Sequence, residues 1–546
     1  MDSTVTLAAT AWTLLPIFLT IACVFLTRRI LLSMSVGIIA SAFMVANFNL
    51  FQTVIRIERT FTSILIPGVR VTDEMAITGG NNLFSVFSRW YMGIIIFLLA
   101  LGIITSFVVL TGGAQAFVRS VAGKVKTRKG VQFVTVIIGI ILMIDDYFNA
   151  MVNGNIAKTM SQEHKLSRAR SSYIVDSIAA PICIVAPVSS WAVAIMGNME
   201  RVYDNIGHEG NIFLDFLGMI PYHFYVFVAI ALVLVTIKFD FNMFSMAKYE
   251  KILADTGVDE SADVSGETLL GTAASTKGTV WDFWGPIIAL TAATIGTMIV
   301  TGWQGADAAD IAYRGLVYAI LDNLSLSMSL LLGGLVGIVV TLYMGARHIK
   351  SGEVTVQQYR KAILAGLMSM AAPIMILVLS WTLASLIGEL ETGLFVANVI
   401  EGAGIYAGFI PFIMFVSAAL IAFSIGTSWG TFAIVLPIAG MVVATTGNMH
   451  LLLPAMSAVM SGAVFGDHAS PISDTTVLSS AGTSAKVIAH FESQLPYALL
   501  AAALAGIGYL FLGLTGNLFV GYIALAVAIA AVAFFAKSRQ DKGAKS

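Results

Sequence analysis

The chain has 546 residues, of which 58% are hydrophobic and 11% are charged, and its formal net charge is −1. Soluble proteins carry about 25% charged residues, so this composition excludes an ordinary soluble protein. The near-zero net charge gives no attraction to nucleic acid, and the two cysteines lie in separate apolar segments, so no disulfide framework is expected. Repeated apolar runs of about 20 residues predict an all-α polytopic membrane protein.

Eleven apolar stretches are predicted to cross the membrane as helices. The first follows an N-terminus without the basic region of a cleaved signal peptide, so we expect it to stay in the mature protein. In chain order, the predicted crossings lie near residues 5–27, 30–50, 89–117, 171–197, 218–238, 282–302, 316–345, 362–389, 450–484, 496–515 and 518–537.

Two further apolar stretches do not fit as single crossings and are predicted to be re-entrant hairpins. Residues 131–157 lie between two basic loops, so both ends of this stretch face the same side if basic loops are cytoplasmic. Residues 406–446 are about twice as long as one crossing requires, and polar residues interrupt them at 424–431. Irregular backbone at membrane depth is tolerated where protein buries it or where it lines a cavity.

The distribution of Lys and Arg predicts the orientation in the membrane. Eleven crossings and two hairpins place the N-terminus outside and the C-terminus in the cytoplasm. In this arrangement 24 of the 30 basic residues face the cytoplasm, which is a strong positive-inside bias. The six basic residues on the outer side are Arg56, Arg59, Arg70, Arg89, Arg201 and Arg314.

The chain is predicted to consist of two transmembrane repeats, residues 1–239 and 281–516, joined by a polar cytoplasmic linker at 240–280. Residues 517–546 add a final helix and a basic cytoplasmic tail. Each repeat has five predicted crossings with a hairpin after the third, and the two repeats start on opposite sides of the membrane. We therefore expect inverted-topology repeats, each with a re-entrant hairpin and a broken helix, as in many secondary transporters.

A short sequence match supports the two repeats. In the first repeat, Ala180-Pro181-Ile182 precedes Ser189-Ser190. In the second, Ser470-Pro471-Ile472 precedes Ser479-Ser480 at the same spacing. The match predicts that these two segments hold equivalent positions.

Four polar interruptions occur at matched places in the apolar segments of the two predicted repeats. Two are hairpin tips, at residues 145–155 and 426–431, and two are helix breaks, at residues 176–190 and 461–480. Charge in hydrocarbon is costly, so ionisable side chains at this depth are candidates for a functional site.

Proline is expected to break these helices, because it removes a backbone donor and clashes with the preceding turn. The breaks are predicted near Pro181, Pro187 and Pro471. A broken helix frees carbonyl oxygens that could bind a hard cation such as Na⁺, and it exposes a helix N-terminus that favours an anionic group. Carboxylates and hydroxyls add the oxygen ligands that hard cations prefer.

Polar side chains at the four interruptions are the candidate ion- or substrate-binding residues. Asp146 and Asp467 are the favoured Na⁺ ligands, because uncompensated charge at a helix break is so costly. Carboxylates also cap helix N-termini, so ligand and cap are weighed about equally for Asp145, Asp176 and Asp474. The candidate set is Asp145, Asp146, Asn149, Asp176, Ser189, Ser190, Thr427, Ser428, Thr431, Asp467, His468, Ser473, Asp474, Thr475 and Thr476.

Some of these candidates have a second interpretation. His468 could sense pH, although we favour a hydrogen-bonded partner of Asp467. The hydroxyls of Ser189, Ser190, Thr475 and Thr476 could serve only to satisfy freed backbone groups.

Enzyme signatures are missing or out of context. The chain has no HExxH motif and no P-loop. Residues 426–430 match GxSxG, but a nucleophile elbow needs a strand before it, and here an apolar segment of membrane length surrounds the match. We therefore expect no enzyme and no cofactor, with Na⁺ and H⁺ as transported or coupling ions in place of ATP.

At two motifs the chain resembles the NhaC family of Na⁺/H⁺ antiporters. They are SIGTSWGT at residues 424–431 and FGDHASPISDTT at residues 465–476. The similarity extends more loosely to residues 144–149 and 176–190. The resemblance implies a carrier of the inner membrane that handles Na⁺ and is driven by an ion gradient.

The leading hypothesis is a Na⁺/H⁺ antiporter that works by alternating access in the lipid bilayer. In this hypothesis Asp146 and Asp467 alternate between Na⁺ and a proton. The alternative is a Na⁺-coupled carrier of an organic solute such as an amino acid or a carboxylate. There the helix N-termini near Ser189-Ser190 and Thr475-Thr476 hold the carboxylate of the substrate. The sequence leaves open whether the protein is a monomer or a homodimer.

Overall fold

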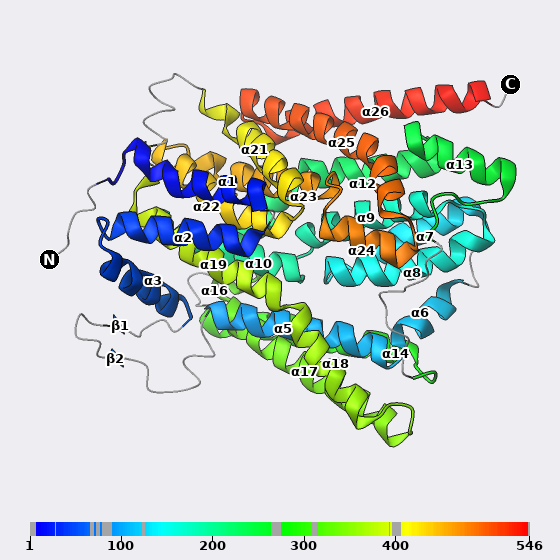
Figure 1. Ribbon diagram of the computed structural model, residues 1–546, viewed down its shortest axis with the longest axis horizontal. Coiled ribbons are helices and arrows are strands. Elements are labelled where there is room, and N and C mark those ends of the chain that lie inside the picture. Colours follow the sequence, from blue (N-terminus) through cyan, green and yellow to red (C-terminus); the bar gives the residue numbers. More distant parts are fainter. Residues whose placement is uncertain are drawn as a thin grey trace.

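A computed structural model describes residues 7–27, 29–65, 70–71, 77–78, 90–122, 126–263, 275–306, 315–392, 394–395 and 406–543. Most helices run along the long axis of an elongated bundle (Figure 1). Within the described residues, ten helices are long and apolar enough to cross a membrane, or up to twelve if each bent pair counts as one span. The chain is therefore an all-α polytopic membrane protein, as predicted, with one short β-hairpin.

The elements of the first part of the chain start near the N-terminus and end before the linker. They are η1 (Ala11–Leu14), α1 (Leu15–Thr27), α2 (Ile30–Val45), α3 (Leu50–Leu65), β1 (Arg70–Val71), β2 (Ile77–Thr78), α5 (Trp90–Leu110), α6 (Gly113–Ala122), α7 (Arg128–Ile141), α8 (Asp146–Glu163), α9 (Arg168–Val185), α10 (Ser190–Ile206), α11 (Ile212–Met219), η2 (Ile220–Tyr222) and α12 (Phe224–Phe239).

The linker and the rest of the chain hold the remaining elements. They are α13 (Phe244–Thr256), α14 (Val280–Gly305), α16 (Leu316–Asn323), α17 (Leu326–Lys350), α18 (Val356–Ser369), α19 (Ala371–Glu389), η3 (Ala407–Phe409), α21 (Ile410–Ile425), α22 (Ser428–Thr445), η4 (Met449–Leu451), α23 (Leu452–His468), α24 (Asp474–Thr483), α25 (Val487–Thr515) and α26 (Leu518–Gly543).

Both predicted hairpins are pairs of helices with a break at the expected tip. The tip between α7 and α8 ends at Asp145, whose carboxylate accepts a hydrogen bond from the Phe148 backbone N (2.9 Å). The tip between α21 and α22 contains Gly426 at φ +74°, a left-handed conformation that glycine adopts at little cost. Because α21 and α22 each have the length of a span, re-entry of this segment stays a prediction.

Two of the three expected proline breaks are present. Pro187 lies between α9 and α10, which meet at an angle of 45°, and Pro471 lies between α23 and α24. The break expected at Pro181 is wrong, because α9 continues through this residue to Val185. A buried transmembrane helix tolerates an internal proline when its surroundings satisfy the freed backbone groups.

The structure also changes the register of the match between the two repeats. Ser189 is the N-cap of α10, whereas Ser479 and Ser480 lie inside α24. The N-cap of α24 is Ser473, two residues after Pro471, just as Ser189 follows Pro187 by two residues. Ser189 and Ser473 therefore hold the same local position in the two breaks, as the N-cap two residues after a proline.

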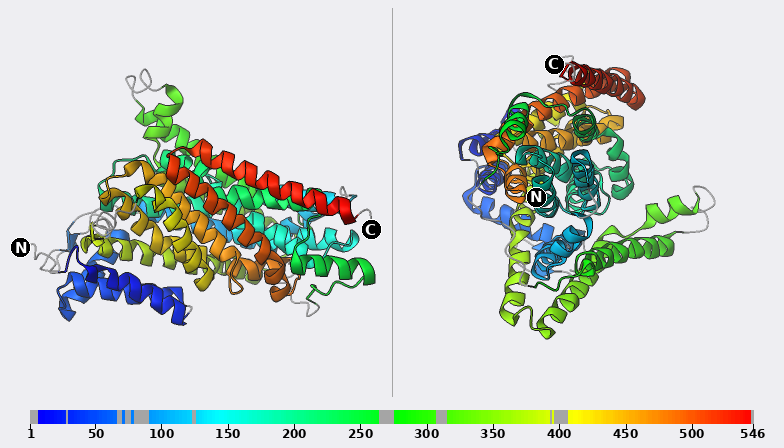
Figure 2. Two further views of the ribbon diagram at one scale, coloured as in Figure 1. Left: turned by 90° about the horizontal axis from the view of Figure 1, so that it is seen from above. Right: turned by 90° about the vertical axis from the view of Figure 1, so that its right-hand side faces the viewer.

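Helices at the centre of the bundle carry the polar breaks. In the spans formed by α22 and α23, 83% and 78% of the residues are buried inside the protein, against 11% in α26. α24 packs against α8 and α9, and α10 packs against α22. A separate arm of α14, α16, α17 and α18 projects from the side of the bundle (Figure 2).

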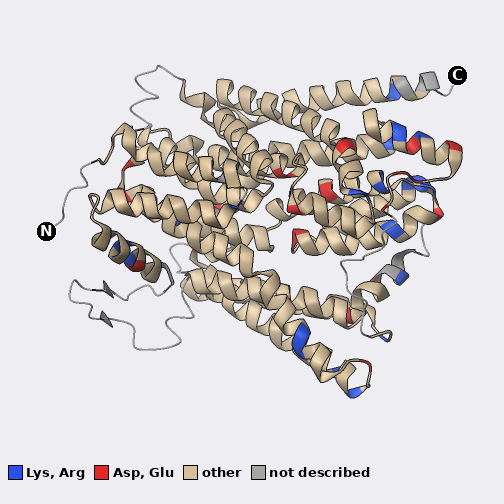
Figure 3. Cartoon of the chain, viewed as in Figure 1, with Lys and Arg blue, Asp and Glu red and all other residues tan. Residues whose placement is uncertain are grey.

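Charged residues are distributed unevenly over the molecule. Lys and Arg gather at the end of the bundle that holds α13 and the C-terminus, whereas acidic residues also occur in its middle, near α23 and α24 (Figure 3). A concentration of basic residues at one end is what the positive-inside prediction requires. The orientation itself stays a prediction.

The described part of the linker, residues 240–263 and 275–280, contacts the segment between α24 and α25. It contains α13, and its Ala262 pairs with Ala485 in an isolated antiparallel bridge. The Asp263 N donates to the Ser484 O (2.9 Å), and the Lys486 N donates to the Ser261 O (2.8 Å). The linker therefore adds a strand-like contact to the segment between α24 and α25.

The same linker caps the first turn of α9. The backbone N of Ser167 donates to Glu250 Oε1 (3.1 Å), and that of Arg168 donates to Asp259 Oδ2 (2.8 Å). The backbone N of Ala169 donates to the Oγ of Ser261 (3.0 Å). Helix starts leave such N–H groups without partners, so these linker side chains satisfy three of them.

A close approach of α8 and α24 gives a stability prediction. A Cβ at Gly154 would lie 2.9 Å from backbone atoms of Gly482, whereas a Cβ at Gly296 of α14 would meet nothing within 4 Å. We expect Gly154→Ala to destabilise the protein by about 1–3 kcal/mol, because the two backbones must separate. Gly296→Ala is the control and should be neutral or stabilising by up to about 1 kcal/mol. Thermal unfolding in detergent measures both, and equal melting temperatures would contradict the close contact.

Candidate functional site

The N-terminal ends of four helices, α8, α10, α22 and α24, meet inside the bundle. The Tyr147 hydroxyl of α8 donates to Asp474 Oδ2 of α24 (2.5 Å). The Ser190 backbone N at the start of α10 donates to the Ile144 O just before α8 (2.8 Å). These contacts bring the first hairpin tip together with both helix breaks.

Asp467, in the last turn of α23, connects α22 to α24. Its Oδ2 accepts hydrogen bonds from the backbone N (3.0 Å) and the Oγ (2.7 Å) of Ser428. Its Oδ1 accepts from the Oγ of Ser473, the N-cap of α24 (2.5 Å). Asp467 is 2% exposed. Partial positive charge at the start of both helices stabilises a carboxylate at this point.

Two tryptophan rings connect the remaining pair of helix ends. The ring of Trp191 in α10 lies 5.7 Å from that of Trp429 in α22, in an edge-to-face arrangement. The indole N–H groups of both residues are buried and have no hydrogen-bond partner. The four helix ends are thus connected to one another by a ring of contacts, in part through Asp467 of α23.

Asp146 is the least satisfied carboxyl group of this ring. It is the first residue of α8 and is 1% exposed, and neither of its oxygens accepts a hydrogen bond. The Trp191 indole N–H lies near this carboxyl group but does not have the geometry of a hydrogen bond to it. Asp145, Asp467 and Asp474 are close enough to Asp146 that negative charge on them would repel a carboxylate there. A buried carboxylate without a partner is costly, so a cation or a proton would stabilise it.

Further buried oxygens in this region have no hydrogen-bond partner. They are the hydroxyl oxygens of Ser190, Ser470 and Thr476 and the amide oxygen of Asn153. No three or more His, Cys, Asp or Glu side chains among the described residues could hold a metal ion together. Carboxylate, hydroxyl, amide and carbonyl oxygens are the ligands that a hard cation such as Na⁺ prefers.

Several predicted residues are placed in structural roles. Asp145 caps α8, and Ser189 caps α10 by accepting from the Ala192 backbone N (2.9 Å).

Asn149 donates to the Gly139 O (2.7 Å), and the Thr431 hydroxyl donates to the Thr427 O (3.0 Å). Thr427 is the N-cap of α22 without a side-chain capping bond, and the Thr475 hydroxyl contacts that of Ser473 (2.9 Å).

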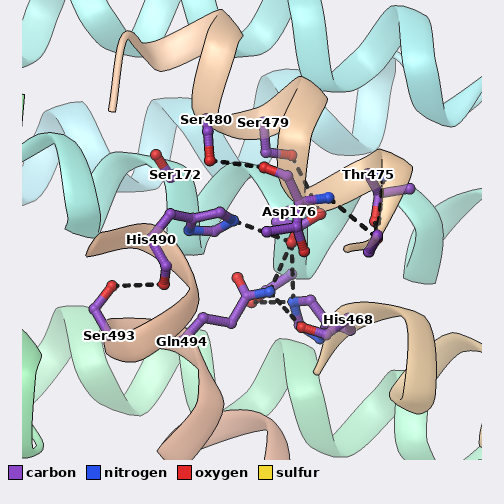
Figure 4. Close-up of polar contacts among 12 residues, drawn as sticks. Ser172, Asp176, His468, Thr475, Ser479, Ser480, His490, Ser493 and Gln494 are labelled. Atoms are coloured by element: carbon purple, nitrogen blue, oxygen red, sulfur yellow. Dashed lines mark hydrogen bonds and ion pairs between the residues drawn. The ribbon is translucent and has the colours of Figure 1, made fainter. Parts of the chain in front are cut away.

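A second polar cluster surrounds Asp176, in the middle of α9 (Figure 4). Its Oδ2 accepts from Gln494 Nε2 (2.6 Å) and contacts His490 Nε2 (3.2 Å). Its Oδ1 accepts from the Ser479 hydroxyl (3.2 Å). The cluster joins α9, α24 and α25.

His468 belongs to this second cluster. Its Nδ1 contacts the Tyr225 hydroxyl (2.7 Å), and its Nε2 contacts the Ser177 hydroxyl (3.1 Å) and lies 4.0 Å from Asp176 Oδ2. The expected hydrogen bond between His468 and Asp467 is wrong, because successive residues of a helix point in different directions.

The sequence interpretation missed six polar residues of the two clusters, which are Tyr147, Ser177, Tyr225, Ser479, His490 and Gln494. His490 and Gln494 lie one helical turn apart in α25, but the predicted crossing began only at residue 496. Their spacing of four residues at the edge of an apolar run was a usable signal. Tyr147 and Tyr225 gave no signal, because a tyrosine in an apolar helix is usually a packing residue.

Comparisons with known proteins agree with this architecture. Residues 182–514 match the model of the Na⁺/H⁺ antiporter family. An uncharacterised protein of Haemophilus influenzae is 33% identical over 538 residues, which cover 97% of this chain and 96% of that protein. The malate-2H⁺/Na⁺-lactate antiporter of Bacillus subtilis is 35% identical over 135 residues, 22% of this chain and 28% of that protein.

A solved structure supports the fold. MtrF of Neisseria gonorrhoeae, described with a class of antimetabolite efflux pumps, superposes with a TM-score of 0.52 and 13% identity, over 86% of this chain and 84% of that chain. The proteins of this family are transporters and not enzymes, so the protein is a secondary transporter of the membrane. The family match covers the second hairpin tip and both helix breaks, and the chain belongs to the Na⁺/H⁺ antiporter family.

Proposed function

We propose that the protein exchanges Na⁺ for protons across the cytoplasmic membrane by alternating access. One observation carries the proposal: two buried carboxyl groups, Asp146 and Asp467, lie where four helix N-termini meet. Each carboxyl group can bind either a proton or, with neighbouring oxygens, a Na⁺ ion. Competition between the two ions for one pair of carboxyls couples their movement.

The hydroxyl groups around Asp467 suit this exchange. Ser428 Oγ and Ser473 Oγ both donate to Asp467 in the structure. A hydroxyl has one donor and two acceptor lone pairs. Ser473 Oγ already accepts from the backbone N of Thr475 (3.1 Å) and Thr476 (3.2 Å), so Ser428 Oγ is the hydroxyl that can turn a lone pair toward a cation while the carboxylate binds the same cation. When a proton occupies the carboxyl group, this hydroxyl returns to bonding with it. The same atoms thereby serve both states of the cycle.

Alternating access requires that the ends of the site open in turn. At the predicted cytoplasmic end, the linker pairs with residues 484–486 and caps α9, so this end is held closed. The broken helix pairs α9–α10 and α23–α24 are the proposed moving unit with the two hairpins. Inverted repeats supply two related conformations, one open to each side.

A second candidate function is the Na⁺-coupled transport of an organic acid. It is favoured by the partial match to a malate and lactate antiporter. The unpartnered hydroxyls of Ser190 and Thr476, in the first turns of α10 and α24, could donate to a substrate carboxylate.

A single assay separates the two functions. Purified protein in liposomes with an internal pH dye is challenged with Na⁺, Li⁺ or K⁺. We expect Na⁺ entry to drive protons out and K⁺ to have no effect beyond protein-free liposomes. If Na⁺ alone moves no protons but drives uptake of labelled malate, lactate or an amino acid, the antiporter proposal is wrong and the organic solute is the substrate.

A further inference from the structure

We propose that Asp176 and His490 form a proton-transfer pair between the Asp467 site and the predicted cytoplasmic end, an inference that rests on the proposed Na⁺/H⁺ exchange. Neither residue contacts Asp146 or Asp467 directly. The pair lies beside the ion site and belongs to the second polar cluster (Figure 4). Its proposed role is to move protons to and from the ion site.

The position of the pair fits a route from the site to the cytoplasm. Asp176 lies eight residues into α9, about 12 Å from the end that the linker caps. His490 lies in the first turn of α25, just after Lys486, which also bonds to the linker. The pair therefore occupies the depth between the ion site and the closed end.

The inner end of the route is tied to the ion site by two contacts. Gln494 Nε2 donates both to Asp176 Oδ2 and to the backbone O of His468, the residue after Asp467 (2.6 Å each). The carboxyl groups of Asp176 and Asp474 are close enough to interact electrostatically. Asp474 in turn accepts from Tyr147, next to Asp146.

The outer end of the route has hydroxyl groups at helical spacing. Ser172 and Asp176 are one turn apart on α9, and Ser479 and Thr483 are one turn apart on α24. The Ser172 and Thr483 hydroxyls lie 2.5 Å apart. These hydroxyl groups therefore lie between the Asp176 carboxyl group and the linker contact at residue 484.

His490 has the geometry of a group that passes a proton on. Its Nε2 lies 3.2 Å from Asp176 Oδ2, whereas its Nδ1 is buried and has no hydrogen-bond partner. A proton leaves the Asp176 carboxyl group for Nε2, and another proton leaves the imidazolium from Nδ1 toward water on the cytoplasmic side. The carboxylate then takes the next proton from the ion site, and the ring must turn so that its deprotonated Nδ1 faces the carboxyl group, which resets the pair without returning a proton. Protons move in the opposite direction by the same steps.

A buried carboxylate held by hydrogen bonds could also be purely structural, so the groups around Asp176 matter for the test. Those that face it are His490 and Gln494 of α25, His468 of α23, Ser479 and Asp474 of α24, and Tyr225 of α12. Gln can donate a hydrogen bond to Asp176 in place of His490 but cannot accept and release a proton. His490→Gln therefore keeps the structural bond and removes the proposed transfer.

The test uses the full-length protein in liposomes with an internal pH dye. We expect His490→Gln to slow Na⁺-driven proton movement at least about 10-fold and to flatten its pH profile, while the Na⁺ concentration for half-maximal rate changes less than about 2-fold. The matched control is His164→Gln at the end of α8, where the ring contacts the Met160 O (3.0 Å). The control should keep the wild-type rate and pH profile.

The outcomes distinguish this inference from the proposed function. A folded His490→Gln variant with the wild-type rate and pH profile overturns the inference but leaves Na⁺/H⁺ exchange intact. If His490→Gln does not fold, Asp176→Asn is measured in its place, and a wild-type pH profile there overturns the inference equally. If the wild-type protein moves no protons with Na⁺, the proposed function and this inference both fail.

Discussion

Asp467→Asn is expected to reduce Na⁺-driven proton movement in proteoliposomes by at least about 10- to 100-fold. Asparagine offers a cation no negative charge and cannot take up the transported proton. Ser428 and Ser473 donate hydrogen bonds to the two oxygens of Asp467. The amide NH₂ of asparagine is itself a donor, so one of these hydrogen bonds would be lost. Losing a hydrogen bond to a charged group costs about 1.5–3 kcal/mol. Since about 1.4 kcal/mol corresponds to a factor of ten, this loss alone would slow exchange by about 10- to 100-fold. The rate of dye response after Na⁺ addition measures the effect.

Asp215→Asn is the matched control for this substitution. Asp215 of α11 also accepts a hydrogen bond, from the Tyr203 hydroxyl (2.9 Å), but lies outside both polar clusters. The control should transport at the wild-type rate, and thermal unfolding should show that both variants are folded. Wild-type turnover by folded Asp467→Asn would remove this carboxyl group from the mechanism.

A reversible cross-link between the linker and the start of α25 is expected to stop exchange. The flanking hydrogen bonds make Ala262 and Ala485 a non-hydrogen-bonded antiparallel pair, with Cα atoms about 4.5 Å apart in such pairs. A disulfide spans this separation, so oxidised Ala262→Cys/Ala485→Cys should lock the closed end. Proteoliposome exchange should fall to background after oxidation and recover after reduction.

The two single variants, Ala262→Cys and Ala485→Cys, control for the native Cys23 and Cys183. Both should keep the wild-type rate under the oxidising conditions, and mass spectrometry should find the new disulfide only in the double variant. Full exchange by the oxidised double variant would show that the linker contact stays closed throughout the cycle.

The helix breaks were predictable because local chemistry determines them. Pro187 and Pro471 each precede a serine that caps the next helix, and Gly426 supplies a left-handed turn. Pro181 shows the limit of such reasoning. Whether a proline ends a helix depends on how neighbouring helices satisfy the freed backbone groups, which the local sequence does not contain.

The individual site residues were easier to predict than their partners. Asp146 and Asp467 stood out because charge is rare in an apolar segment, and the structure buries both in the same region. Which donors Asp467 would bind depended on how α22 and α24 pack beside α23. His490 was missed because its helix was expected to start nine residues later than it does.

In the proposed exchange cycle, the cap that the linker places on α9 also sets how often the site can open. Three backbone N–H groups of α9 bond to linker side chains, and each such bond contributes about 0.5–1.5 kcal/mol net. If they break together when the end opens, the open conformation is disfavoured by about 3 kcal/mol from this contact alone. That gap keeps the open population at about 1% or below, unless ion binding favours the open state by a similar amount. In the proposed cycle, the linker contact therefore makes the end open mainly when ion binding supplies the missing free energy.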